Sequence, residues 1–116
     1  MAEQCPVERS LKIIGSKWTI LIIHNLLRGT KRFGELGAAL GGVSPKMLAQ
    51  RLRELERDGI VERRLYPEVP LRVEYDLTEK GQAMQGVVEA IRCWGEAYPV
   101  AGDPAVELEE KEAIYQ

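Results

Sequence analysis

The sequence predicts a mainly α-helical fold with a small β-hairpin, arranged as a winged helix-turn-helix. A short apolar helix, a glycine pair and a basic helix follow one another over residues 33–58. Two β-prone runs, separated by prolines, come directly after them over residues 60–77. Apolar residues at helical spacing fill the segments on both sides. A helix-turn-helix followed directly by a hairpin is the arrangement of a DNA-binding motif with a wing.

Length and composition limit the chain to one ordinary domain. It has 116 residues, of which 45% are hydrophobic, so a modest core is possible. The first residues lack the basic and apolar regions of a secretory signal, and the most apolar run, residues 18–27, is about half as long as a membrane span. We therefore expect a cytoplasmic protein without membrane partners.

The distribution of charge is more informative than the net charge of −2. Residues 28–72 carry ten Lys/Arg and six Asp/Glu, whereas residues 103–116 carry one Lys and five Asp/Glu. An acidic end thus conceals a basic middle, which favours a nucleic-acid partner.

Helical periodicity accounts for the first part of the chain. Residues 7–14 have apolar side chains on one face, and Gly15 ends that helix. Residues 17–28 are apolar all round, which predicts the most buried helix. Residues 33–40 form a short one-sided helix that ends at Gly41 and Gly42.

The next helix has clear ends and two distinct faces. Ser44 suits the N-cap, Pro45 the first helical position and Gly59 the position after the end. At 100° per residue, one stripe faces the core and the opposite stripe faces outward. The core stripe is Leu48, Leu52 and Leu55, and the outward stripe is Lys46, Gln50, Arg53 and Arg57.

The outward stripe is either an ordinary solvated face or a DNA-contacting face. Lys suits guanine, Gln suits adenine and Met suits an apolar contact, and the N-terminal part of such a helix enters the major groove. We therefore predict base contacts by Lys46, Met47, Gln50 and Arg51, and a phosphate contact by Arg53. Arg57 lies too near the helix end. Arg51 has an equal alternative as the partner of a carboxylate at the edge of the core.

The wing and its surroundings supply further basic residues. Arg63 and Arg64 lie on the first strand, and Arg72 is expected at the hairpin tip, where it would enter the minor groove. Lys31 and Arg32 are expected to bind phosphates before the short helix. The complete set of predicted DNA-binding residues is Lys31, Arg32, Ser44, Lys46, Met47, Gln50, Arg51, Arg53, Arg63, Arg64 and Arg72.

The C-terminal part predicts one long helix over residues 78–98, which Thr78 starts and Pro99 stops. Its apolar residues are spaced by three and four, as in a helix–helix interface. Part of this surface would cover the protein's own core, and the remainder would form a dimer. Residues 99–116 are expected to be an acidic tail or a short helix capped by Asp103. The domain itself would span residues 1–98, with the helix-turn-helix at 33–58, the wing at 60–77 and the dimer helix at 78–98.

Several motifs resemble one family in sequence and in order. They are CPVERSLKIIGSKWTILIIHNLL, KRFGELGAAL, SPKMLAQRLRELERDGIVERRLYPEVPLRVEYDLTEKG and the later Trp in RCWGEAY. Together they cover about Cys5 to Tyr98 and resemble the HxlR-type family of bacterial winged-helix transcriptional regulators, which have a MarR-like fold. Leu71 departs from the pattern, because the family often has a second proline there.

The resemblance implies a homodimer that binds a palindromic DNA operator and controls transcription, as a repressor for instance. Ser44–Asp58 would be the recognition helix and Arg63–Arg72 the wing. Dimerisation would use the N- and C-terminal helices. The expected interface residues are Val7, Leu11, Ile14, Met84, Val87, Ile91, Trp94 and Tyr98.

The resemblance also implies redox sensing for the cysteine before the first helix. Cys5 is thus a candidate sensor of oxidants or electrophiles, with an inert half-buried thiol as the equal alternative. Cys93 is expected to pack in the dimer helix, and His24 at the edge of the core. A small-molecule effector is also possible, but no residue pattern predicts a metal site or a cofactor.

Two other function classes compete with the regulator. A winged-helix module that binds protein would usually have a less basic and more apolar recognition face. An enzyme is disfavoured because the sequence has one His, no Gly-rich phosphate loop and no recognisable catalytic set.

Overall fold

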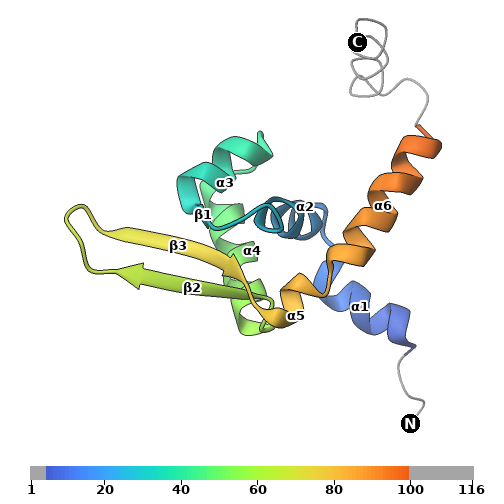
Figure 1. Ribbon diagram of the computed structural model, residues 1–116, viewed down its shortest axis with the longest axis horizontal. Coiled ribbons are helices and arrows are strands. Elements are labelled where there is room, and N and C mark those ends of the chain that lie inside the picture. Colours follow the sequence, from blue (N-terminus) through green and yellow to red (C-terminus); the bar gives the residue numbers. More distant parts are fainter. Residues whose placement is uncertain (1–4, 100–116) are drawn as a thin grey trace, which may run out of the picture. The chain divides into compact units, whose positions relative to one another are not determined.

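The structure is a computed structural model that describes residues 5–99 (Figure 1). The predicted continuation beyond Pro99, with its possible cap at Asp103, lies outside this range. The elements in chain order are α1 (Pro6–Ile14), α2 (Lys17–Leu26), β1 (Lys31–Arg32), α3 (Phe33–Leu40), α4 (Pro45–Arg57), β2 (Val61–Tyr66), β3 (Arg72–Leu77), α5 (Glu79–Gln82) and α6 (Gln85–Ala97). Helices dominate, and α3, α4 and the β2–β3 hairpin form the predicted winged helix-turn-helix.

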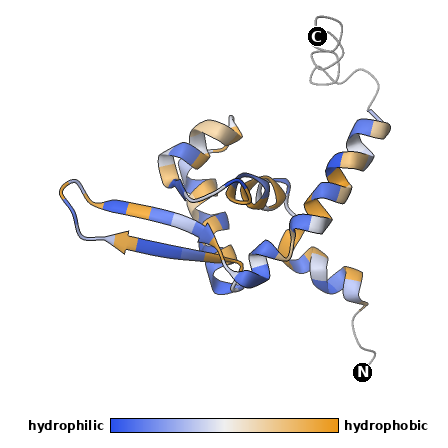
Figure 2. Ribbon diagram, in the orientation of Figure 1, coloured by the Kyte–Doolittle hydropathy of each residue, from blue (hydrophilic) through white to orange (hydrophobic). Residues whose placement is uncertain are grey.

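The core lies around α2, as the continuous apolar character of this helix predicts. Thr19, Ile22, Ile23 and Leu26 are buried, and α2 packs on α3, α4 and β3. Figure 2 shows α2 mostly in the hydrophobic colours, whereas β2 is mostly hydrophilic. The helix ends at Leu26 rather than at the predicted residue 28.

The sheet has three antiparallel strands in the order β1-β3-β2, so the prediction of a two-stranded wing was incomplete. β1 pairs Lys31 with Tyr75 and Arg32 with Glu74. The hairpin register pairs Val61 with Leu77 at its base and ends with the Tyr66–Arg72 pair. The hairpin projects from the helices α2–α4 (Figure 1), and its loop is residues 67–71.

The predicted single helix over residues 78–98 was wrong, because two helices, α5 and α6, take its place. Thr78 does start α5, and its side chain accepts a hydrogen bond from the Gly81 amide (3.1 Å). The Met84 amide then donates to the Gly81 carbonyl (3.0 Å), a three-residue closure typical of a helix end. Gly81 and Gly86 flank the break, and glycine has a low helix propensity.

A joint connects the end of α4 to the start of α5. The Thr78 amide donates to the Ile60 carbonyl (3.0 Å), its hydroxyl donates to the Gly59 carbonyl (2.5 Å), and Lys80 Nζ donates to the Asp58 carbonyl (2.9 Å). Gly81 is buried here, and a Cβ at this position would collide with the Ile60 carbonyl oxygen. Thr78, Lys80 and Gly81 thus fix the segment that follows the predicted recognition helix.

Packing divides the described chain into two compact units, with the boundary after Gln85. The first contains the helix-turn-helix, the wing and α1. The second contains almost all of α6.

Candidate nucleic-acid interface

Local signals at both ends define α4. The Ser44 hydroxyl accepts a hydrogen bond from the Met47 amide (3.0 Å), and Pro45 occupies the first turn. At the other end Gly59 has φ of +74°, which only glycine adopts readily. The Gly59 amide donates to the Glu56 carbonyl (3.1 Å) and the Ile60 amide to the Leu55 carbonyl (2.9 Å), a Schellman motif. Both predicted ends of this helix are confirmed.

The two faces of α4 are also as predicted. Leu48, Leu52 and Leu55 are each only 1% exposed. The outward side chains are all exposed, and they are Lys46, Gln50, Arg53 and Arg57. Met47 is partly exposed beside them. The Arg57 Nε atom lies 3.6 Å from the Asp58 carboxylate, at the end of the helix.

Glu54 organises the middle of this helix, a role that the sequence did not predict. Its carboxylate accepts hydrogen bonds from Arg51 Nη1 (2.8 Å) and from Gln50 Nε2 (3.3 Å). The hydrogen bond from Arg51 is the largest cause of the lowered pKa of Glu54. The Arg51 Nε atom is buried without a hydrogen-bond partner. The structure therefore contains the carboxylate partner that was the alternative interpretation of Arg51.

Strand alternation divides the wing into two faces with different chemistry. We define the inner wing face as Val61, Arg63, Leu65, Val73, Tyr75 and Leu77, and the outer wing face as Glu62, Arg64, Tyr66, Arg72, Glu74 and Asp76. Within each strand these sets alternate, and across the hairpin each residue pairs with one of its own set.

The inner wing face borders a groove against α4. This groove has a volume of about 370 Å³ and is lined by Ala49, Leu52, Arg53, Glu56, Arg63 and Tyr75. Tyr75 is 9% exposed and pairs with Arg63, so it forms part of a packed base. Within residues 5–99, neither Arg53 nor Arg63 forms an ion pair. Two unpaired guanidinium groups, one from each element, therefore line the same groove.

The arginines of the outer wing face form ion pairs with nearby carboxylates. Arg64 lies 3.3 Å from Glu62 and 3.8 Å from Asp76, and the hydrogen bond that it donates to Glu62 is the main cause of its raised pKa. Arg72 lies 3.0 Å from Glu68 and 3.9 Å from Glu74. Each arginine of this face is thus paired with two carboxylates.

The predicted position of Arg72 at the hairpin tip was wrong. It is the first residue of β3, opposite Tyr66, and its guanidinium lies 4.1 Å from the centre of the Tyr66 ring. Its Nε atom is buried without a hydrogen-bond partner. The side chain is held by the ring and the carboxylates, whereas Val69 and Leu71 of the loop are exposed.

Lys31 and Arg32 form β1, directly before α3. Lys31 is partly exposed and Arg32 is exposed. The Arg32 amide donates to the Glu35 carboxylate (2.8 Å), which satisfies one free amide at the start of α3. Both side chains remain candidates for phosphate contacts, held by pairing with β3.

Both predicted dimerisation segments expose apolar side chains. In α1, Val7 is 64% and Leu11 is 55% exposed, while Ile14 is partly exposed. In the second unit, Trp94 is 66% exposed, and its ring lies 5.4 Å from that of Tyr98. Val87, Ile91 and Tyr98 are exposed as well, whereas Met84 precedes α6 and is partly exposed.

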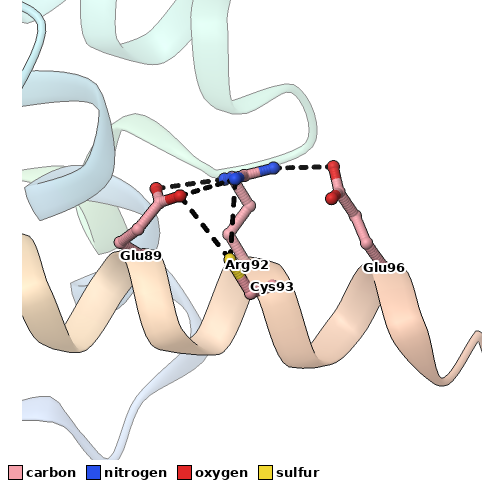
Figure 3. Close-up of polar contacts among 4 residues, drawn as sticks. All are labelled: Glu89, Arg92, Cys93 and Glu96. Atoms are coloured by element: carbon pink, nitrogen blue, oxygen red, sulfur yellow. Dashed lines mark hydrogen bonds and ion pairs between the residues drawn. The ribbon is translucent and has the colours of Figure 1, made fainter.

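The opposite side of α6 is polar and carries Cys93 (Figure 3). Arg92 binds Glu89 and Glu96 at 2.5 and 2.7 Å, and Glu89 is the largest cause of its raised pKa. The Cys93 Sγ atom lies 3.6 Å from both Glu89 and Arg92. Cys93 is exposed within the single chain, and its expected packing in the dimer helix stays a prediction.

Cys5 and His24 complete the predicted positions. Cys5 is exposed, at the N-cap of α1, and makes no side-chain cap hydrogen bond. His24 is partly exposed in α2, as expected for the edge of the core.

Over residues 5–99, no three His, Cys, Asp or Glu side chains lie together in a way that would hold a metal ion. No helix in that range is both long and apolar enough to span a bilayer.

Comparisons with known proteins agree with the geometry of α3, α4 and the wing. The family model of the HxlR-like helix-turn-helix matches residues 13–102. The transcriptional regulator YodB of Bacillus subtilis is 45% identical over 107 residues, which cover 91% of this chain and 96% of YodB.

Solved structures show the same similarity. The oxidised redox regulator HypR has a TM-score of 0.79 at 41% identity, over 84% of this chain and all of HypR. Reduced YodB has a TM-score of 0.73 at 44% identity, over 87% of this chain and all of the YodB chain. The protein therefore belongs to the HxlR-like helix-turn-helix family of transcriptional regulators.

Proposed function

We propose that this DNA-binding transcriptional regulator binds a palindromic operator as a homodimer, with α4 in the major groove and the inner wing face on the backbone. The observation that carries this proposal is a set of cations on α4 and on β2 that form no ion pair with any residue of the range 5–99, namely Lys46, Arg53 and Arg63. The outer wing face offers no comparable set, because its arginines are already paired with carboxylates. Membership of the family favours this function over a protein-binding module.

Within α4, Lys46 and Gln50 are the proposed base-contacting residues, with Met47 as an apolar neighbour. Ser44 supports them by capping the helix, so we assign it a positioning role beside its possible phosphate contact. Arg51 is bound to Glu54, and a base contact by Arg51 would require this ion pair to open. Lys31 and Arg32 would add phosphate contacts from β1.

The test is a selection of binding sites from genomic DNA with purified protein. We expect one enriched palindrome whose half-sites lie about 34–36 Å apart. Lys46→Ala and Gln50→Ala should relax base preference within the half-site, and affinity should fall steeply with salt. Absence of an enriched palindrome together with a flat salt dependence would show that the proposal is wrong.

The homodimer is proposed from the exposed apolar residues of α1 and α6. Each of these helices exposes several apolar side chains, and exposed apolar surface usually marks an interaction site. Light scattering should give twice the mass of the chain, and Ile91→Glu should produce monomers that bind the operator weakly. The matched control is Glu96→Gln on the polar side of α6, which should remain dimeric.

We also propose that Cys5 responds to oxidants or electrophiles. HypR is described as a redox regulator, and YodB has been crystallised after treatment with diamide. Cys5 is exposed beside the apolar residues of α1, where addition to a quinone would form a C–S bond and leave a reduced ring with two hydroxyl groups. Operator affinity should change with a quinone in the wild type but not in Cys5→Ser. An equal response of both proteins would exclude Cys5 as the sensor.

A further inference from the structure

Glu54 contacts two side chains of α4 that lie on different sides of that helix. One carboxylate oxygen, Oε2, accepts a hydrogen bond from Arg51 Nη1 (2.8 Å), and the other, Oε1, accepts one from Gln50 Nε2 (3.3 Å). Arg51 and Glu54 are partly buried, whereas Gln50 is exposed on the outward stripe. Glu54 therefore connects a side chain at the edge of the core to a proposed base-contacting side chain.

Arg51 determines the position and the charge of this carboxylate. The two residues are three positions apart, so their side chains meet on neighbouring turns of the helix. The hydrogen bond from Arg51 lowers the pKa of Glu54, and the carboxylate is therefore ionised at neutral pH. An ionised carboxylate only accepts hydrogen bonds. Because Arg51 uses Oε2, the other oxygen stays available to Gln50.

This ionised carboxylate selects one orientation of the Gln50 amide. The amide has an NH₂ group on one side and a carbonyl oxygen on the other, and only the NH₂ group can donate to Glu54. Turning the amide over would place two acceptors against each other. The hydrogen bond of 3.3 Å is long, so it contributes little to stability, but it still distinguishes the two orientations. The Gln50 carbonyl oxygen has no hydrogen-bond partner within residues 5–99.

We propose that Glu54 is a positioning residue that makes Gln50 present its carbonyl oxygen to the major groove, and that Gln50 therefore selects adenine or cytosine on the strand it contacts. In that groove adenine offers an amino group at N6 and cytosine one at N4, and both can donate to the oxygen. Guanine and thymine offer acceptors there, which the oxygen cannot bind. A glutamine without Glu54 could turn over and bind either class. This inference rests on the proposed function, because it requires α4 in the major groove.

The test compares base preference at one position of the operator. This position is the base pair at which Gln50→Ala changes the outcome of a binding-site selection. There, wild type should favour adenine or cytosine over guanine or thymine on one strand by about fivefold, the effect of one hydrogen bond. Glu54→Ala should reduce this ratio to less than about twofold, with the preferences at other positions unchanged. Competition experiments by fluorescence anisotropy, with operators that differ only at this base pair, measure the ratio.

Glu56→Ala is the matched control on the same helix. The Glu56 carboxylate forms no hydrogen bond or ion pair with any residue of the range 5–99, so this variant should keep the wild-type ratio. Both variants remove one negative charge, so a general electrostatic gain in affinity would appear in both. Alanine has a high helix propensity, and circular dichroism should show that both variants keep their helices.

A second variant tests the acceptor directly. A carboxylate at position 50 has oxygens only, so Gln50→Glu combined with Glu54→Ala should restore the preference for cytosine or adenine, although the added charge weakens binding overall. This readout separates positioning from a merely structural role of Glu54, because loss of helix stability would lower affinity for all four operators equally.

Several results would overturn the proposal. These are a wild-type preference for guanine or thymine at this position, an unchanged ratio in Glu54→Ala, an equal loss of the ratio in Glu56→Ala, or no return of the preference in the double variant. A selection in which Gln50→Ala changes no position would also overturn it, because Gln50 would then contact no base. Failure of the proposed function is distinguishable, since the wild type itself would then enrich no operator.

Discussion

The inner and outer faces of the wing each carry arginine and tyrosine but offer different surfaces to a partner. Arg63 and Arg64 are neighbours in the sequence, yet Arg63 lines the groove against α4 without an ion pair, and Arg64 lies between Glu62 and Asp76. The charge of an arginine that is already paired is balanced by its partners, so it adds less net positive potential to a DNA-binding surface. Charge available to DNA therefore depends on strand alternation and on neighbouring acids, and the number of arginines alone does not determine it.

The largest expected change of operator affinity comes from substituting Arg63, with its neighbour Arg64 as the comparison. Arg63→Gln should weaken operator binding by about tenfold, because it removes a charged hydrogen bond to phosphate. Since a dimer carries the change twice, the slope of log affinity against log salt should fall by about 2. Arg64→Gln is the matched control, and both are measured by fluorescence anisotropy. Equal losses in the two variants would abolish the distinction between the faces.

Arg72 tests whether the outer wing face is structural. Arg72→Ala should lower the free energy of unfolding by about 1 kcal/mol, because it removes the contact with the Tyr66 ring and a paired charge. Chemical denaturation measures this loss, and a double-mutant cycle with Tyr66→Leu isolates the ring contact. If Arg72→Ala were as stable as the wild type but had lost operator affinity, Arg72 would contact DNA and its proposed structural role would be wrong.

Glu54 extends the comparison to α4, where it pairs with Arg51. Its lowered pKa means that the pair stabilises the fold above the pKa of an unfolded glutamate, and that this stabilisation is lost as the pH falls through the folded-state pKa. The contribution should be ~0.5 kcal/mol. Urea denaturation between pH 7 and pH 3 should show a weaker pH dependence for Glu54→Gln than for the wild type. Identical profiles would contradict the ion pair.

The smallest effect comes from removing one acid from each face. Glu62→Gln releases part of the outer pairing of Arg64 and should change operator affinity by less than about twofold, because exposed ion pairs contribute little. Glu56→Gln removes the carboxylate of the groove and should raise affinity more. The two variants are compared at the same salt concentration. A larger gain from Glu62→Gln would place DNA against the outer face.

Elements with local signals were predictable from the sequence. The boundaries of α4 follow from Ser44, Pro45 and Gly59, and its core stripe follows from the leucine spacing. β1 was missed because two residues show no periodicity, and its pairing partner lies more than 40 positions away. The start of β3 at Arg72 depends on the hairpin register, which two prolines in the loop obscured.

The ion pairs between side chains of the candidate site could be predicted from the sequence only in part. Arg51 and Glu54 are three residues apart, a spacing that permits an ion pair. The same spacing also allows both side chains to be solvated separately, so the sequence alone does not show which arrangement forms. The position of Cys93 was predictable, because helical geometry separates it from Ile91 by about 160°.

The close contact at Gly81 has a consequence for natural and laboratory variation. Any side chain there would displace the Ile60 carbonyl, and with it the segment that ends α4. Substitutions at position 81 should therefore appear among inactive variants although the residue lies far along the chain from every proposed base contact. A mutational map of this protein should show an intolerant site there, and restoring activity would require changes around residues 58–60.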